Sequence, residues 1–174
     1  KSNFQVKVCV TAQHREMLDQ VLDFFEIIPE YDLDLMQPNQ TLNSLSATIL
    51  SKIDLVLNKE KPDLVLVHGD TTTSSMVALA AFHLGIRVGH VEAGLRTYNK
   101  KSPFPEEINR QLTSRLADVH FTPTNQATQN LLAEGVLQKS IIETGNSIID
   151  ALFWTLNKIE AENKSLLERT GAKS

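Results

Sequence analysis

The stretch from Asp63 to Arg96 limits the possible folds of this 174-residue chain more than any other part. An apolar run, Leu64 to Val67, is followed by a polar turn, an apolar segment of helical length from Ser74 to Leu84, and a second apolar run, Arg87 to Val91. The order is therefore strand, turn, helix, strand. Near-continuous apolar strands joined by a helix are typical of a parallel sheet covered by helices.

An acid follows each of these two strands: Asp70 after the first and Glu92 after the second. The carboxyl ends of neighbouring parallel strands face a shared crevice, which is where such sheets bind ligands. Asp70 and Glu92 are therefore the first candidates for chemistry. A purely structural interpretation is also open, because Asp70 and the threonines after it suit a helix cap and Glu92 could pair with Arg96 or Arg110.

Strands and helices alternate along the rest of the chain. The pattern predicts strands at 4–11, 119–122 and 140–144, helices at 14–25, 42–58, 105–116, 124–134 and 148–162, and loops at 28–40 and 98–105. This order predicts an α/β fold with a mostly parallel sheet and helices on both faces. Residues 1–162 are expected to form one domain, and residues 163–174, which lose apolar character, are expected to be a linker.

Composition and missing motifs exclude several classes of protein. The net charge of −4 gives no basic stripe for a nucleic acid, and no apolar run approaches the roughly 20 residues that span a bilayer. The single cysteine, Cys9, lies in an alternating strand and predicts a buried thiol in a soluble, cytoplasmic protein. The chain has no G-x-G-x-x-G, no P-loop and no G-x-S-x-G. His90-Val91-Glu92 lacks the cysteine pair of a zinc deaminase, so no metal site is expected.

A third acidic feature is Pro105-Glu106-Glu107-Ile108-Asn109-Arg110. Acids favour the first turn of a helix, and Glu106 and Arg110 have the spacing of an ordinary ion pair on a helix surface. On spacing alone the structural interpretation is the stronger one here.

Five ordered blocks carry a more specific signal, and they cover the chain from about Val6 to Leu152. They are TAQHREMLDQVL (11–22), HGDTTTS (68–74), GHVEAGLRT (89–97), SPFPEEINRQLTSRLAD (102–118) and ETGNSIIDAL (143–152). Together they resemble the bacterial non-hydrolysing UDP-N-acetylglucosamine 2-epimerases.

The resemblance implies one Rossmann-like half of a GT-B-like, two-domain enzyme, active as a homodimer in the cytoplasm. It implies reversible epimerisation at C2 of UDP-N-acetylglucosamine to UDP-N-acetylmannosamine, by loss and re-addition of UDP, for precursors of cell-envelope polysaccharides. Neither a metal nor a nicotinamide cofactor is implied.

The family motifs place the catalytic acids at Asp70, Glu92 and Glu106. We expect Asp70 and Glu106 to transfer protons, and Glu92 to act at the sugar ring. Asp70 and Glu92 are also expected to bind substrate, together with Arg110, which should orient Glu106. Weaker assignments to the nucleotide-sugar cleft are Gln13, His14 and Arg15.

The sequence also departs from the family pattern. A first strand and turn reading roughly F-G-T-R-P-E is absent, as is the carboxyl-terminal domain. We therefore expect an amino-terminal fragment that lacks epimerase activity alone and whose sheet has lost a strand partner. Three other functions stay open: a hydrolysing 2-epimerase, a nucleotide-sugar binding module without turnover, and one half of a GT-B glycosyltransferase.

Overall fold

The computed structural model describes residues 3–11, 15–36 and 39–170, with side chains up to residue 161. Its strands are β1 (Cys9–Val10), β2 (Tyr31–Asp32), β3 (Leu64–His68), β4 (Arg87–Val91), β5 (Val119–Thr122) and β6 (Ile141–Glu143). Its helices are α1 (Arg15–Phe24), α2 (Leu42–Glu60), α3 (Thr72–His83), α4 (Glu106–Leu116), α5 (Asn125–Ala133) and α6 (Ser147–Thr170). A 3-10 turn, Gln138–Ser140, precedes β6.

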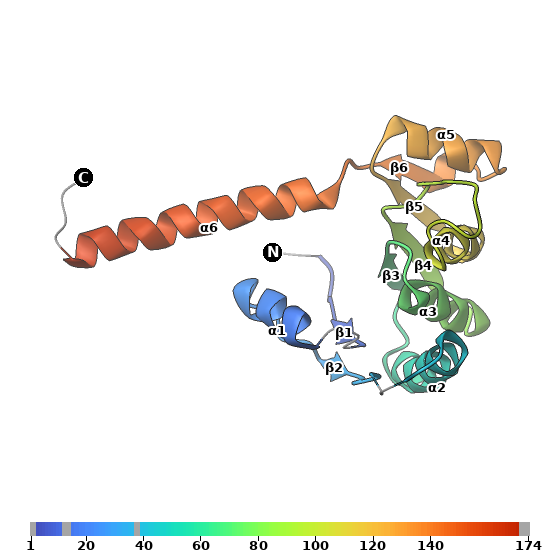
Figure 1. The fold of residues 1–174 in the computed structure, drawn as a ribbon, viewed down its shortest axis with the longest axis horizontal. Coiled ribbons are helices and arrows are strands. Elements are labelled where there is room, and N and C mark those ends of the chain that lie inside the picture. The colour runs from blue at the N-terminus through green and yellow to red at the C-terminus, as the bar shows by residue number, and fades with distance from the viewer. Residues whose placement is uncertain (1–2, 12–14, 37–38, 171–174) are drawn as a thin grey trace.

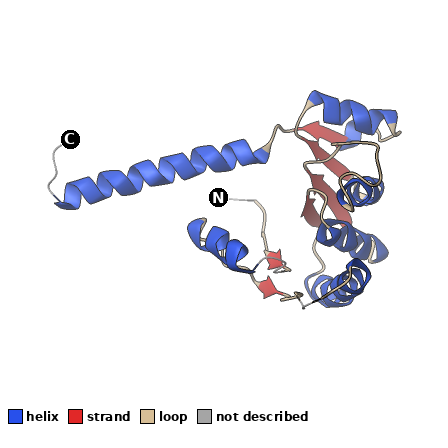
Figure 2. Ribbon diagram, in the orientation of Figure 1, coloured by secondary structure: helices blue, strands red, loops and turns tan. Residues whose placement is uncertain are grey.

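The described strands form two separate parallel sheets (Figure 2). β1 pairs with β2, and β3 to β6 form a four-stranded sheet in chain order. Leu64 of β3 pairs with Arg87 of β4, and His68 pairs with Val91, so both strands end at the same level. A helix separates β3 from β4, β4 from β5 and β5 from β6, as parallel pairing requires. The predicted α/β class with a parallel sheet is confirmed.

Helices α2 to α5 lie along one side of the four-stranded sheet (Figure 1). Side chains alternate between the two faces of a strand, so Val67 is buried beneath these helices while its neighbour Leu66 is 60% exposed. Leu64 and Ile142 are also exposed on the face of Leu66. Helices were expected on both faces of the sheet, but on this second face they do not cover Leu64, Leu66 and Ile142.

Threonine caps begin three of the helices. Thr41, Thr71 and Thr124 have extended backbones, and each side-chain oxygen accepts from the amide three residues ahead. Such a bond satisfies one of the amides that a helix start leaves unpaired. The predicted strands at 87–91 and 119–122 and the predicted cap at Thr124 are confirmed.

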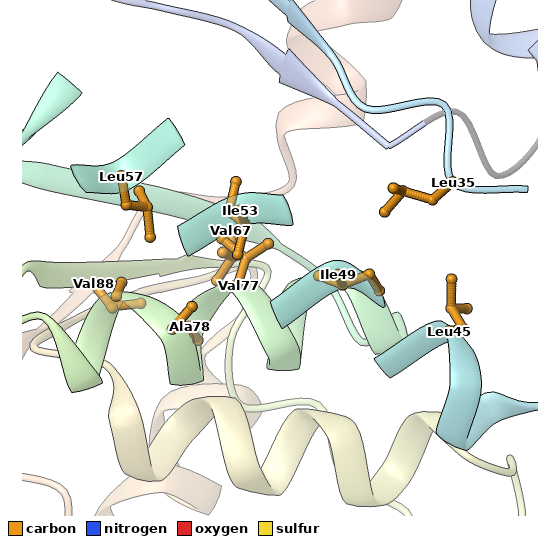
Figure 3. Close-up of a cluster of buried hydrophobic side chains, with 11 residues drawn as sticks. Leu35, Leu45, Ile49, Ile53, Leu57, Val67, Val77, Ala78 and Val88 are labelled. Atoms are coloured by element: carbon orange, nitrogen blue, oxygen red, sulfur yellow. The ribbon is translucent and has the colours of Figure 1, made fainter. Parts of the chain in front are cut away.

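The main apolar core lies between α2, α3 and the sheet (Figure 3). Apolar side chains on α2 recur every four residues, which places them along one side of the helix. They pack with Val67 of β3 and with Val77 and Ala78 of α3; the α2 residues are Leu45, Ile49, Ile53 and Leu57. The core therefore fixes α3, and with it the turn that precedes α3.

The first predicted strand, 4–11, is wrong in length, because only Cys9 and Val10 form a ladder. Its partner β2 is just as short, and Val6 remains 72% exposed. The Cys9 thiol is half-buried, and burial raises its pKa to about 11, with the Asp32 charge adding to the effect.

Helix α6 extends away from the sheet (Figure 1) and continues to Thr170, so the predicted helix end at Glu162 is wrong. It contacts the end of α1, where Trp154 stacks on Phe25 at 4.9 Å between ring centroids and Lys158 donates to the Phe24 carbonyl at 2.7 Å. The division of the chain at residue 162 stays a prediction. Over the described residues, none of the helices combines the length and apolar character needed to cross a membrane.

Candidate active site

The candidate active site lies at the carboxyl ends of β3 and β4. These strands end side by side, and the chain leaves them through Asp70 and Glu92. Both carboxylates are partly exposed, at 30% and 28% of their side-chain surface. The structure therefore brings together the two acids that the sequence placed at strand ends.

The cap of α3 is Thr71 and not Asp70. The Thr71 hydroxyl oxygen accepts from the Ser74 amide at 3.1 Å, whereas the Asp70 carboxylate accepts a hydrogen bond from Arg110. The sequence left open whether Asp70 caps the helix or carries chemistry. The structure gives the cap to Thr71, so capping does not account for Asp70. Asp70 points instead towards another helix, α4.

Arg110 of α4 connects the two acids. Its side chain is 7% exposed, and one terminal nitrogen, Nη2, forms ion pairs with Asp70 and, at 3.4 Å, with Oε2 of Glu92. The other terminal nitrogen, Nη1, donates to the Glu92 carbonyl. A planar guanidinium with several fixed donors suits such multiple contacts. Arg110 thus joins β3, β4 and α4 at one point.

Glu92 has a left-handed backbone, with φ of +62°. This conformation is uncommon for a residue other than glycine and is often kept at functional sites. The structural interpretation of Glu92 was an ion pair with Arg96 or Arg110, and the pair with Arg110 is confirmed. The Arg96 guanidinium pairs instead with Glu134, just after α5, at 2.7 Å.

Glu106 begins α4, one turn before Arg110, so the two side chains lie on the same side of the helix. The expectation that Arg110 orients Glu106 is wrong, since the hydrogen bonds of Arg110 go to Asp70 and Glu92. Oε2 of Glu106 is buried and has no hydrogen-bond partner among the described residues.

Glu107 is a functional candidate that the sequence analysis missed. It is 3% exposed and accepts from the backbone amides of Thr97 and Tyr98 at 2.9 and 3.1 Å, and from Gln111 at 2.7 Å. Burial alone would raise its pKa, but these donors outweigh burial and lower it. Glu107 therefore holds the loop that connects Glu92 to α4. A second acid beside Glu106 was the only sequence signal for it.

The assignment of Gln13, His14 and Arg15 to the border of the nucleotide-sugar cleft stays a prediction. Gln13 and His14 lie outside the described residues. Arg15 is half-exposed and forms ion pairs with Asp19, Asp32 and Asp34. The end of β1 does reach the start of α3, where the Thr11 and Thr73 hydroxyls lie 3.3 Å apart.

A metal site was not expected, and the described part of the chain contains no group of three or more His, Cys, Asp and Glu side chains that could hold one. The candidate site itself offers acids and one buried arginine. Three carboxylates and a fixed cation can move protons and orient a polar ligand.

The whole sequence was compared with known proteins. The family model described as UDP-N-acetylglucosamine 2-epimerase matches residues 1–173. The chain is 56% identical to the UDP-N-acetylglucosamine 2-epimerase of Salmonella borreze over 164 residues, covering 94% of this chain and 43% of that one. It is 55% identical to the Escherichia coli K12 enzyme over 161 residues, covering 92% and 43%.

Solved structures agree. The Neisseria meningitidis enzyme bound to UDP-GlcNAc superposes with a TM-score of 0.89 at 50% identity, covering all of this chain and 47% of that one. The Methanocaldococcus jannaschii enzyme in complex with UDP-GlcNAc and UDP gives 0.85 at 38% identity, covering 91% and 44%. The chain thus spans less than half the length of these relatives.

Proposed function

This chain belongs to the UDP-N-acetylglucosamine 2-epimerase family, and we propose that it supplies the acidic wall of such an enzyme's active site. The reaction is reversible epimerisation at C2 of UDP-N-acetylglucosamine, which gives UDP-N-acetylmannosamine. Support comes from the match to the family model over residues 1–173 and from relatives whose structures hold UDP-GlcNAc and UDP.

The observation that carries this proposal is the group formed by Asp70, Glu92 and Arg110. Two acids from neighbouring strands meet one buried arginine at the edge of the sheet where parallel α/β folds bind ligands. In the proposed reaction the C2 proton leaves as the bond from C1 to UDP breaks, which gives 2-acetamidoglucal and UDP. UDP then adds back at C1 while C2 gains a proton on its other face.

The two proton transfers occur on opposite faces of the sugar, so they require two groups. We assign them to Asp70 and Glu106, which come from different elements, and we assign Glu92 to the sugar ring. Oε2 of Glu106 is buried and finds no hydrogen-bond partner within the described ranges, which suits a group whose partner is a substrate. Arg110 holds Asp70 and Glu92 in place.

The 174 residues alone are proposed to be inactive, because they match less than half the length of the relatives. The active form is proposed to be a longer, two-domain, homodimeric enzyme of the cytoplasm that supplies cell-envelope polysaccharide precursors. Turnover by the 174-residue chain would contradict the first statement, and a monomeric active enzyme in light scattering would contradict the dimer.

The deciding experiment follows the C2 hydrogen of UDP-N-acetylglucosamine by NMR in deuterated water. The full-length enzyme should incorporate deuterium at C2, and Asp70→Asn should reduce incorporation at least a hundredfold, since removing a general acid or base costs roughly that much. Asp54→Asn, at an exposed position on α2, should leave incorporation unchanged. Normal exchange in Asp70→Asn would remove Asp70 from the mechanism.

Product analysis and UDP calorimetry on the same enzyme separate the other functions. Free N-acetylmannosamine and UDP as final products would indicate a hydrolysing epimerase. UDP binding by calorimetry without exchange would indicate a binding module, and transfer of the sugar to an acceptor would indicate a glycosyltransferase.

A further inference from the structure

His90 is a buried imidazole that the proposed chemistry does not use. It lies in the middle of β4, paired with Val67 of β3 and His120 of β5, and it is 0% exposed. Its Nε2 lies 2.8 Å from the carbonyl oxygen of Gly69. Gly69 directly precedes Asp70, so this bond links the middle of β4 to the backbone that carries a candidate catalytic acid.

Gly69 is held by two consecutive residues at the end of the neighbouring strand. His90 contacts its carbonyl, and the Val91 carbonyl accepts from its amide at 3.0 Å. Its φ is +70°, and a Cβ placed there would lie 3.4 Å from Oε2 of Glu92. Both polar groups of the Gly69 backbone are therefore fixed from β4, and the position next to Glu92 is occupied by a residue without a side chain.

The protonation state of His90 allows its ring to act as a hydrogen-bond donor to Gly69. Burial is the main cause that lowers the pKa of His90 to about 4, with smaller contributions from nearby Arg110, His120 and Arg96 and an opposing one from the bond to Gly69. The ring is therefore neutral at neutral pH, and its one N–H must be on Nε2, because a carbonyl oxygen can only accept. Its Nδ1 is buried without a hydrogen-bond partner in the described part of the chain.

We propose that His90 is a positioning residue for the acid pair. Its Nε2–H fixes the Gly69 carbonyl, and the peptide between Gly69 and Asp70 then directs the Asp70 carboxylate to Arg110, beside Glu92. The catalytic part of this inference rests on the proposed function, since it assigns His90 an effect on proton transfer at C2. The geometric part concerns Asp70 and Arg110 alone.

The test compares three variants of the full-length enzyme. His90→Leu fills the space without a donor, and His90→Gln keeps a side-chain N–H that can reach the Gly69 carbonyl. His120→Leu is the matched control, because His120 is also buried, pairs with His90 across the sheet, and forms no hydrogen bond with Gly69 or Asp70 in the described structure. The readouts are kcat, KM and crystal structures.

We expect His90→Leu to lower kcat at least tenfold with KM within threefold of wild type, and His90→Gln to recover most of kcat. His120→Leu should stay within threefold of wild type in both. In crystal structures, the ion pair between Asp70 and Arg110 should be broken in His90→Leu and intact in His90→Gln. Equal loss of kcat in His90→Leu and His120→Leu, or equal loss in His90→Leu and His90→Gln, would overturn the proposal.

Failure of the proposed function is recognised separately. If wild-type enzyme shows neither epimerisation nor C2 exchange, that function is wrong, and the crystal structures still decide the positioning role. An unchanged ion pair between Asp70 and Arg110 in His90→Leu would then refute it.

Discussion

Arg110 and Asp70 form an ion pair across 40 positions of the chain, between α4 and the turn after β3. The same arginine reaches both the carbonyl and the carboxylate of Glu92. One side chain therefore supports the candidate chemistry and ties three elements together.

Replacing Arg110 should destabilise the chain itself. Arg110→Met leaves Asp70 and Glu92 without their cation, and we expect a loss of about 2 kcal/mol in the free energy of unfolding. This is less than a fully buried pair would cost, because both acids remain partly exposed. Urea unfolding of the 174-residue chain measures it. Arg15→Met, whose ion pairs are half-exposed, should cost less than about 1 kcal/mol. Equal costs would refute the central role of Arg110.

Gly94 should tolerate no side chain. A Cβ at this position would lie 2.3 Å from the Ala127 carbonyl oxygen on α5, and the φ of +86° is left-handed. We expect Gly94→Ala to lower the free energy of unfolding by about 3 kcal/mol, from overpacking and backbone strain together.

The matched control for Gly94 is Gly135→Ala. Gly135 has a φ of +84° but nothing within 4 Å of a Cβ, so only backbone strain, about 1 kcal/mol, applies. A similar loss at both positions would show that the close approach to α5 carries no cost.

Neutral His90 should make the fold sensitive to acid. The pKa of His90 is about 4 in the folded chain, below its ordinary value, so the unfolded state binds the proton more readily. The stability it contributes is present above pH 6.5 and is lost as the pH falls towards 4. Between pH 7.5 and 4.5 the loss is about 2 kcal/mol. His90→Leu should show a correspondingly smaller pH dependence in urea unfolding, and an identical dependence would contradict this account.

Glu107 should order the loop at residues 97–102. Glu107→Gln removes the negative charge and one of the two oxygens that accept from the Thr97 and Tyr98 amides. At least one of these amides should therefore exchange with solvent at least tenfold faster in hydrogen-exchange NMR. The donors hold the pKa of Glu107 below its usual range. In wild type, the protection of these amides from exchange should therefore persist at neutral pH and fall only when the pH drops through this lowered pKa. The exposed Glu16→Gln is the control. Unchanged exchange in Glu107→Gln would show that other contacts order the loop.

Local signals predicted much of the fold. The bounds of β4 and β5 follow from short apolar runs between polar turns, and the start of α5 follows from Thr124, whose cap involves only neighbouring residues. The length of β1 could not be predicted this way, because a strand extends only as far as its partner does.

Part of the candidate site was also predictable from the sequence. Parallel strands end at one edge, so the proximity of Asp70 and Glu92 follows from the strand pattern. The partner of Arg110 depends instead on how α4 packs against the sheet. Its spacing from Glu106 is that of a local pair, yet the hydrogen bonds go to acids much earlier in the chain.

The order of the strands also affects how the chain can fold. In the four-stranded sheet every strand pairs with the next one in the sequence, so each new strand emerging from the ribosome meets an edge that is already synthesised. Among the described strands, none of this sheet has to wait for a distant segment, and loop-closure entropy stays low at each step. Assembly can therefore proceed from β3 to β6 during synthesis, and Arg110 reaches Asp70 as soon as α4 docks.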